Sequence, residues 1–491
     1  MVSRFHPHGS SRRLLLAAIL VASLSLWVGC GREPDNVAKQ SGATATVPSI
    51  RVAVVDDPEL GAAIEQQWKA RSAGELTIQT LKAEQLDSMK QLLADVIIYP
   101  SACLGTLAER NLIAPLAEDA VHDPQYALRD VLLLERIREV RWGDSVMAVS
   151  FGSPQLVLIY RADLFKRLKC EVPSTWEEYQ QVATALTREK LGDLAPPADR
   201  RWSAVVEPLA DGWAGTVLLA RAAPYASHPT QFSTLFDYTT MDPLIGGPPF
   251  VRALEELVAA NGLDASSPEL HTPETAKRSL YAGEAAMVLA WSSRAVASGE
   301  SPPTIADGIQ VGFAELPGAA TVYNFAETEW TPRTGGIPPR VPLLSVAGRL
   351  GSVAKNARRP REAAEFLARI AGKSWSTLIA PQSRATTLFR QSQLRNPELW
   401  TDQGLTPEAA RQYVEVVEAT QSRPTHMPSL RIPGWQRYLK ALDVAVHAAR
   451  SGDRTAADAL AEAVATWQKI TEELGREAQR TAYTRSLGLD P

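Results

Sequence analysis

The sequence is poor in cysteine and in closely spaced metal-binding residues. Only three cysteines occur among its 491 residues, too few for a disulfide scaffold, and no pair of them has metal-ligand spacing. Five of the seven histidines lie beyond residue 100, far apart from one another, at positions 122, 228, 271, 426 and 447. The sequence therefore predicts no metal site and no cofactor.

The sequence also lacks an excess of charge of either sign. It holds 51 Lys and Arg against 55 Asp and Glu, a net charge of −4. Without residues 1–29, which contain three Arg and no acid, the balance is 48 basic against 55 acidic side chains, or −7. Because binding to a phosphate backbone depends on clustered Lys and Arg, nucleic acid is not expected as a partner.

Signatures of catalysis are missing as well. The sequence has no G-x-S-x-G elbow and no H-E-x-x-H pair. The stretch AGKS at 371–374 resembles the end of a phosphate loop, but Leu367 stands where that motif requires Gly. These absences predict a protein that is not an enzyme. Two acids opposed across a cleft would suffice for glycoside hydrolysis, so a glycoside-processing enzyme stays open as an alternative.

The amino terminus has the pattern of an export signal. Arg12 and Arg13 precede an apolar run over residues 14–28, which ends before Gly29. A bilayer span needs about 20 apolar residues. This shorter run, with a positive flank and a small residue after it, predicts a signal peptide over residues 1–29. A retained membrane anchor is the alternative.

Cys30 directly follows Gly29, and this junction resembles the bacterial lipoprotein signal. The resemblance implies that the Cys30 thiol receives a diacylglycerol and becomes the mature amino terminus. An exported protein would thereby be anchored to a bacterial membrane, facing the periplasm or the cell exterior. Trp27 stands where that signal usually has Leu. Residues 30–48 are polar, small and aperiodic, which predicts a flexible tether.

From residue 49 onward, strand-like runs alternate with helical patterns. Residues 50–54 have the alternation of a strand, and residues 58–70 carry apolar side chains at helical spacing. Ser174 and Glu177 form a possible capping box at the start of another helix. Further short apolar runs cover residues 96–99, 146–151, 156–160, 287–291 and 309–313. The alternation predicts an α/β protein with open sheets flanked by helices, and the length predicts more than one domain.

Four further motifs occur in a distinctive order. Residues 143–183 contain a strand, a break at 152–154, a second strand and the sequence PSTWEE; then come YAGEAAM at 281–287, QVGFAELP at 310–317 and SVAKNARRPREAAEFLARI at 352–370. Together they resemble the bacterial extracellular solute-binding proteins of family 1, the maltose-binding-protein-like carbohydrate receptors of ABC importers. The resemblance spans nearly all of residues 49–475.

The resemblance implies the two-lobed periplasmic-binding-protein fold of type II, an α/β fold with open mixed sheets and a hinge of two or three crossing segments. The first lobe would comprise residues 49–153 plus 314–425, and the second residues 154–313 plus 426–485. Residues 192–248 and 317–341 fit the family poorly and are expected to decorate the lobes. Cys103 and Cys170 would lie in different lobes, so both are expected to be free thiols.

The same resemblance implies that the protein captures a carbohydrate or related polyol between its lobes. It would act as a monomer and deliver its cargo to the permease subunits of an ABC importer. A sensor or scaffold of the same fold without transport is an alternative. An iron-binding relative is another, but such proteins tend to use adjacent tyrosines, and none of the 11 Tyr here has a Tyr neighbour.

A cleft for a sugar needs aromatic rings for the C–H face and polar groups for the hydroxyls. The sequence holds twelve tryptophans, eleven if Trp27 is set aside. Ligands of open α/β sheets lie beyond the carboxyl ends of strands. These considerations and the resemblance give eight candidate ligand-binding residues: Asp56, Asp57, Tyr99, Glu207, Trp213, Trp291, Trp330 and Trp435.

Four of these candidates lie at the ends of expected strands. Asp56 and Asp57 follow the first strand, although an N-cap before Pro58 explains Asp57 equally well. Tyr99 ends the stretch ADVIIY, where a buried core tyrosine is the alternative to a cleft residue. Trp291 follows the AAM strand, where packing between the lobes is the alternative.

The other four lie in expected loops. Glu207 and Trp213 belong to the Gly-containing stretch EPLADGWAG, whose polar setting predicts exposure, with an ordinary surface loop as the alternative. Trp330 could equally brace a long loop, and Trp435 precedes a helix. By contrast, Trp176 and Trp467 fall on helical apolar stripes and are assigned to the core.

Overall fold

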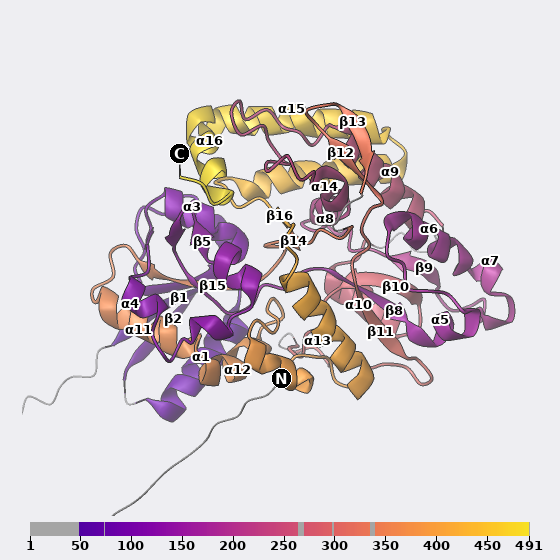
Figure 1. Ribbon diagram of the computed structural model, residues 1–491. Helices are drawn as coiled ribbons and strands as arrows, with labels where there is room; N and C mark the ends of the chain where they lie inside the picture. The colour runs from indigo at the N-terminus through magenta and orange to yellow at the C-terminus, as the bar shows by residue number, and fades with distance from the viewer. Residues whose placement is uncertain (1–48, 73, 264–269, 297–298, 334–338, 491) are drawn as a thin grey trace, which may run out of the picture. The chain divides into compact units, whose positions relative to one another are not determined.

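The computed structural model describes residues 49–72, 74–263, 270–296, 299–333 and 339–490 (Figure 1). The predicted signal peptide (residues 1–29) and the whole predicted tether (residues 30–48) lie outside the described residues, and so does Cys30 with its expected lipid. Among the residues that are described, no helix is both long enough and apolar enough to cross a membrane.

Six strands form the first sheet, in the order β2-β1-β3-β15-β4, with β7 beside β15. β1 is parallel to β2 and β3, whereas β15 is antiparallel to β3, β4 and β7. A sheet covered on both faces has strands that are apolar almost throughout, as in β3. The strands are Ile50–Val55 (β1), Leu76–Leu81 (β2), Val96–Pro100 (β3), Ile113–Ala114 (β4), Val149–Ser150 (β7) and Arg349–Ala354 (β15).

Three helices flank this sheet, namely α1 (Pro58–Arg71), α11 (Pro360–Ile370) and α12 (Lys373–Ile379). They pack through aromatic side chains. The ring of Trp68 on α1 lies 4.9 Å from that of Phe366 on α11 and 5.9 Å from that of Trp375 on α12, measured between centroids. Short helices α2 (Ala83–Leu86), α3 (Leu104–Glu109) and α4 (Glu118–Val121) lie in the loops of the same region.

The second sheet has the order β11-β8-β10-β9. Its strands are Val157–Arg161 (β8), Ser203–Val206 (β9), Ala285–Ala290 (β10) and Val311–Glu315 (β11). β8 is antiparallel to β10 and β11, whereas β10 and β9 are parallel. Helices α5 (Ala162–Leu168), α6 (Trp176–Ala185), α10 (Pro273–Tyr281) and α13 (Pro407–Gln421) flank it. The prediction of open, mixed α/β sheets flanked by helices is confirmed.

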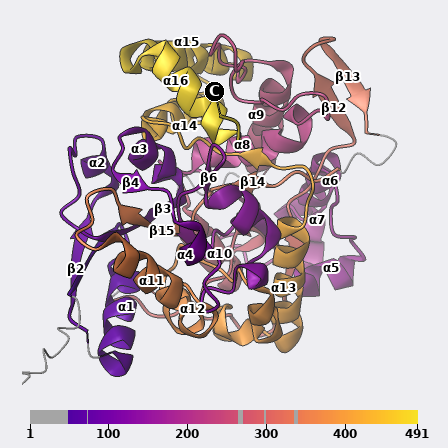
Figure 2. The ribbon, with the colours of Figure 1, turned by 60° about the vertical axis from the view of Figure 1, so that its left-hand side comes forward.

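A helical layer lies beside the second sheet and includes the yellow carboxyl-terminal helices of Figures 1 and 2. It comprises α8 (Ala214–Ala226), α9 (Pro248–Asn261), α14 (Trp435–Ser451), α15 (Ala456–Leu474) and α16 (Arg476–Ser486). α8 and α14 pack closely at Gly215, where a Cβ would come within 2.7 Å of Leu442 Cβ. Trp467 is fully buried against Phe236 and Tyr438, and Trp176 is also buried, so the core assignment of both tryptophans is confirmed.

The chain passes between the sheets at several places. One connection joins β7 to β8 through Gly152, whose φ of +103° favours glycine and whose Cβ would meet Thr387 O at 2.1 Å. The return from β11 to β15 includes β14 (Leu343–Leu344), which pairs with β16 (Met427–Pro428). The two lobe boundaries proposed from the sequence stay a prediction.

Two local expectations were wrong. The capping box of α6 is formed by Thr175 and Glu178, one residue later than predicted, because Thr175 has the extended backbone of an N-cap. Residues 192–248 are also more than a decoration: they contribute β9 to the second sheet and the entirely buried helix α8. The segment 317–341 contributes a small hairpin of β12 (Thr321–Asn324) and β13 (Glu329–Pro332).

Candidate functional site

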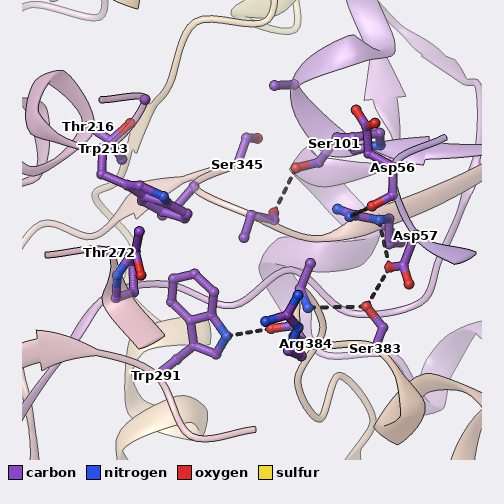
Figure 3. A pocket seen from close by; sticks show the side chains of 18 of the residues that line it. Asp56, Asp57, Ser101, Trp213, Thr216, Thr272, Trp291, Ser345, Ser383 and Arg384 are labelled. Atoms are coloured by element: carbon purple, nitrogen blue, oxygen red, sulfur yellow. Dashed lines mark hydrogen bonds and ion pairs between the residues drawn. The ribbon is translucent and has the colours of Figure 1, made fainter. Parts of the chain in front are cut away.

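A cavity of about 460 Å³ lies between residues that follow the strands of the first sheet and residues at the beginnings of α8, α10 and α14. Figure 3 shows its two sides: labelled Trp213, Thr216, Thr272 and Trp291 on the left, and Asp56, Asp57, Ser101 and Ser383 on the right. We call these the aromatic wall and the polar wall. A volume of this size is within the range of small-molecule sites.

The polar wall is centred on the carboxylate of Asp57. One of its oxygens caps α1 by accepting from Leu60 N at 3.0 Å. The other accepts from Ser383 Oγ at 2.5 Å and lies 2.8 Å from Arg349 Nε. Arg349 also donates to the backbone oxygen of Asp56 at 2.9 Å. Asp57 is therefore both an N-cap and part of the cavity, because its two oxygens serve different partners.

Asp56 occupies the left-handed backbone region, with φ of +51°. Asp tolerates this conformation better than most residues. Its carboxylate accepts from Ala83 N at 3.1 Å and lies 3.4 Å from Lys82 Nζ, and it is about a third exposed. The polar wall thus has one carboxylate buried in an ion pair and one partly open to solvent.

The aromatic wall is built on a pair of indoles. The rings of Trp213 and Trp291 lie 5.5 Å apart between centroids with an interplanar angle of 47°. Trp291, at the end of β10, donates its indole N–H to Arg384 O at 2.9 Å. Ser383 and Arg384 therefore connect the two walls, because the first bonds to Asp57 and the second to Trp291. Trp435, at the start of α14, also lines the cavity.

The position of Trp213 depends on a carboxylate from another helix. Asp443 on α14 accepts from Gly212 N and Gly215 N, both at 2.7 Å. Burial raises the pKa of Asp443, and these two backbone hydrogen bonds oppose the rise. Because the two amides flank Trp213, Asp443 fixes the loop that presents the indole.

A buried charge network supports the aromatic wall. Glu274 lines the cavity and lies 3.0 Å from Lys277 Nζ, which is also 3.0 Å from Asp402 Oδ1. The other oxygen of Asp402 accepts from Tyr281 and from Ser292, the neighbour of Trp291. Burial opposes the charge of Lys277, but Asp402 and Glu274 together raise its pKa above the ordinary value. Arg278 Nε lies 3.2 Å from the other oxygen of Glu274, so two basic groups face the two carboxylates of this network.

The connection from β7 to β8 is hydrogen-bonded to a buried carboxylate that has no ion-pair partner among the described residues. Glu135 lies in the π-helical turn Glu135–Glu139 and is fully buried. It accepts from Ser150 Oγ at 2.6 Å and from Ser153 N at 2.8 Å. Burial, together with the nearby charge of Glu139, raises the pKa of Glu135 to about 8. This site therefore favours a protonated carboxyl at neutral pH.

Five of the eight sequence candidates come together in the cavity, namely Asp56, Asp57, Trp213, Trp291 and Trp435. Sequence reasoning missed the hydrogen-bonding residues Ser101, Thr216, Thr272, Ser345, Arg349 and Ser383, which also line it. A serine or threonine in a loop carries no distinctive signal, so nothing in the sequence pointed to most of these. Arg349 opens β15 and is nearly buried; a charged residue at the edge of an apolar run was the available clue.

The structure places the other three candidates, Tyr99, Glu207 and Trp330, outside the lining of this cavity. Tyr99 is fully buried and shares a hydrogen bond of 2.6 Å with Ser352, which is the core alternative. Glu207 is buried rather than exposed, and pairs with Arg221 of α8. Trp330 on β13 packs against Tyr225 and Tyr323, so it braces its hairpin.

Metal binding and disulfide formation find no support in the described ranges. No group of three or more His, Cys, Asp or Glu side chains in these ranges could hold a metal ion. Cys103 is buried and Cys170 half-buried, and both are free thiols. Burial raises the pKa of both thiols, that of Cys103 to about 12, which makes neither a reactive nucleophile at neutral pH.

Comparison with known proteins adds to this geometry. The family model described as bacterial extracellular solute-binding protein matches residues 90–374. No curated protein matches the sequence. Similar solved structures include an ABC transporter solute-binding protein of Agrobacterium radiobacter K84 in complex with ribitol, at 19% identity and a TM-score of 0.62, covering 86% of this chain and 98% of that one.

Two other solved structures are similar over the same extent. Maltose-bound T. maritima MalE3 is 17% identical with a TM-score of 0.60, covering 86% of this chain and 99% of that one. An ABC transporter solute-binding protein of Agrobacterium vitis S4 with bound D-mannitol is also 17% identical with a TM-score of 0.60, covering 87% of this chain and 99% of that one. At these identities the likeness shows the two-lobed fold.

Proposed function

Because the chain belongs to the family of bacterial extracellular solute-binding proteins, we propose that it is a receptor for a carbohydrate or polyol. The observation that carries the proposal is the 460 Å³ cavity with indoles on one wall and hydroxyls and carboxylates on the other. A sugar or sugar alcohol has C–H groups for the rings and hydroxyls for the polar groups. Three similar structures hold ribitol, maltose and D-mannitol, which supports this class of ligand.

The ligand would act by touching both walls at once. A ligand shifts an equilibrium only by its difference in affinity for the two states. Contacts to Trp213 and Trp291 on one side and to Asp56 and Ser383 on the other would be completed only when the cavity is closed. The ligand therefore favours closure about the segments that join the sheets.

In this proposal the protein is a monomer that delivers its cargo to the permease of an ABC importer. A lipid on Cys30 would hold the receptor near that permease. One acyl chain binds a membrane weakly, whereas two or three hold it well. Residues 30–48 would give the receptor reach from the bilayer. The receptor performs no chemistry on its ligand, so the solute is released unchanged.

The proposal is tested by a thermal-shift screen of the protein against ribitol, D-mannitol, maltose and longer maltodextrins. A ligand at a hundredfold excess over its dissociation constant should stabilise the protein by about 2.7 kcal/mol. Chromatography of the recovered ligand should find it intact. A screen in which no sugar or polyol raises the melting temperature contradicts the proposal, and a changed sugar would identify an enzyme instead.

Transport and sensing are separated by a second experiment. Deletion of the gene should abolish uptake of the radiolabelled ligand if the protein serves an importer. Unchanged uptake, with binding retained in the purified protein, would contradict the transport role and identify a sensor or scaffold. A Cys30→Ser variant should lose membrane association but keep ligand binding, because Cys30 is remote in sequence from every residue that lines the cavity.

A further inference from the structure

A second cavity, of about 240 Å³, adjoins the paired strands β14 and β16. It lies among the π-helical turn Glu135–Glu139, the segment after α8, the segment after α13 and the end of α16. Ser345 lines both this cavity and the first one. The volume is far above the roughly 10–15 Å³ that one water molecule requires, so a small ligand with its own hydration can be accommodated.

The charged groups that face this cavity are mainly basic. Arg138 comes from the π-helical turn, His426 and Arg431 from the segment after α13, and His228 from the segment after α8. Glu139 is the one acid among the described residues of the lining. Its carboxylate already accepts from Ser345 N and Ser345 Oγ, both at 2.9 Å. The end of α16 contributes Ser486 and Leu487, which carry no charge.

Arg431 is the key group because it is buried with unused hydrogen-bonding capacity. The residue is 4% exposed. It donates to the backbone oxygen of Glu139 at 2.9 Å, but its Nε has no hydrogen-bond partner within the described chain. Ser227 Oγ, on another side of the same cavity, is likewise buried without a partner in the described parts. Buried donors of this kind are costly unless a ligand or water satisfies them.

The imidazole of His426 lines the same cavity as the guanidinium groups of Arg138 and Arg431. Burial, followed by the positive charges of Arg138 and Arg431, lowers the pKa of His426 to about 4. The neutral ring therefore lies in a field that disfavours a further positive charge. Such a field attracts anions, because the same two guanidinium groups that repel a proton would stabilise a negative ligand.

We propose that this cavity binds a small phosphate-type oxyanion, held by Arg431 and Arg138 and completed by Ser227. The buried Arg431 supplies the fixed donor, and guanidinium groups match the geometry of phosphate oxygens. Arg138 is exposed and closes the site from the solvent side. The bound group is inorganic phosphate or the phosphate of a small ester, since both present the same oxygens.

Anion binding should be coupled to the protonation of the groups that line the cavity. An anion beside His426 offsets the repulsion from Arg138 and Arg431 and raises the pKa of His426, so protonation and anion binding favour each other. Glu139 opposes the anion when ionised, and burial raises the pKa of Glu139. Both groups therefore act in the same direction.

The test is calorimetric titration of the whole protein with inorganic phosphate at pH 6.0 and 7.5, with ionic strength held constant by sodium chloride. We expect saturable binding at both pH values. Arg138→Gln should weaken it by about tenfold, as loss of one charge-assisted contact does. Arg136→Gln is the matched control, because Arg136 lies in the same turn but does not line the cavity, and it should bind as the wild type does.

A local readout in the wild-type protein keeps the proposal testable if a variant is poorly folded. Phosphate should shift the ¹³C-histidine signal assigned to His426 through a His426→Gln variant, and should raise its pKa. Glycerol 3-phosphate serves as the ester: tighter binding than inorganic phosphate supports the ester as occupant, and weaker binding supports the free ion. Equal affinities of the Arg138→Gln and Arg136→Gln variants, or no shift of the His426 signal at saturating phosphate, would overturn the proposal.

Discussion

The two walls of the first cavity use their polar groups differently. On the polar wall, Asp57 is occupied by Leu60, Ser383 and Arg349, so little of its hydrogen-bonding capacity remains for a ligand. On the aromatic wall, the Trp291 N–H also has a partner, because it donates to Arg384 O. This hydrogen bond lies in the plane of the ring and leaves the faces of the indole available for contact. From this comparison we expect the polar wall mainly to fix the shape of the site and the rings to supply most of the affinity for a ligand.

The largest expected effect is on stability and arises from the polar wall. Asp57→Asn keeps an N-capping residue but removes the charge that faces buried Arg349. Loss of one partner of a buried ion pair costs about 3–5 kcal/mol. Urea denaturation without ligand should therefore show a loss of this order in the free energy of unfolding.

Asp56→Asn is the matched control for that substitution. Asn tolerates the left-handed backbone of this position, and the Asp56–Lys82 pair is largely exposed, so the expected loss is about 1 kcal/mol or less. Equal losses for Asp56→Asn and Asp57→Asn would remove the distinction between a structural and an open carboxylate on the polar wall.

The next effect concerns Glu135, which is hydrogen-bonded to the connection from β7 to β8. The pKa of Glu135 is raised in the folded protein to about 8, above its value of about 4.3 in an unfolded chain. The folded state therefore holds a proton that the unfolded state has lost. Between these pKa values, this group should lower stability by up to about 1.4 kcal/mol for each unit of rising pH.

Glu135→Gln should remove that contribution and leave a shallower decline of stability from pH 5 to 8. Urea denaturation across this range measures the slope for the wild type and the variant. Glu415→Gln changes an exposed glutamate of α13 and should leave the slope as it is. If the slopes of Glu135→Gln and wild type coincide, the Glu135 carboxyl is not the source of the dependence of stability on pH.

Ligand affinity should respond most to the aromatic wall. Trp213→Ala removes one ring of the indole pair, and truncation of a central aromatic contact costs about 2 kcal/mol, or roughly thirtyfold in dissociation constant. Titration calorimetry with the sugar or polyol found by the thermal-shift screen measures this. Trp330→Ala removes an indole of similar exposure outside the cavity and should leave the affinity of the folded protein nearly unchanged.

The smallest effect is expected at the support of the aromatic wall. Asp443→Asn replaces a carboxylate that accepts from both Gly212 N and Gly215 N with a group that has a single acceptor oxygen. Loss of one such hydrogen bond costs about 1–1.5 kcal/mol, and part of this should appear as an affinity several-fold weaker. Unchanged affinity with reduced stability would show that Trp213 keeps its position without Asp443.

The comparison of the walls also explains what the sequence could predict. Asp56 and Trp291 could be chosen as candidates from the sequence because each directly follows a recognisable strand. Ligands of open α/β sheets lie beyond the carboxyl ends of strands. Tyr99 met the same criterion, yet its side chain points to the core, where Ser352 binds it. A shift of one residue along a strand reverses the face, and the apolar run of β3 carries no alternation to reveal it.

The remaining residues depend on contacts that are distant in sequence. Ser383 meets Asp57 from 326 residues away, and Asp443 meets Gly212 from 231 residues away. No local pattern marks such pairs. The expectation that Glu207 is exposed failed for the same reason. The polar stretch around it suggested exposure, but its partner Arg221 lies on the buried helix α8.

Hydrogen–deuterium exchange with and without the identified ligand tests most directly whether the solute bridges the two walls. We expect simultaneous protection of backbone amides around Trp213 on the aromatic wall and around Ser101 and Ser383 on the polar wall. The Tyr323–Trp330 hairpin, which lies outside the cavity, serves as the internal control and should not change. Protection confined to one wall, or absent from both while binding is saturated, would contradict capture between them.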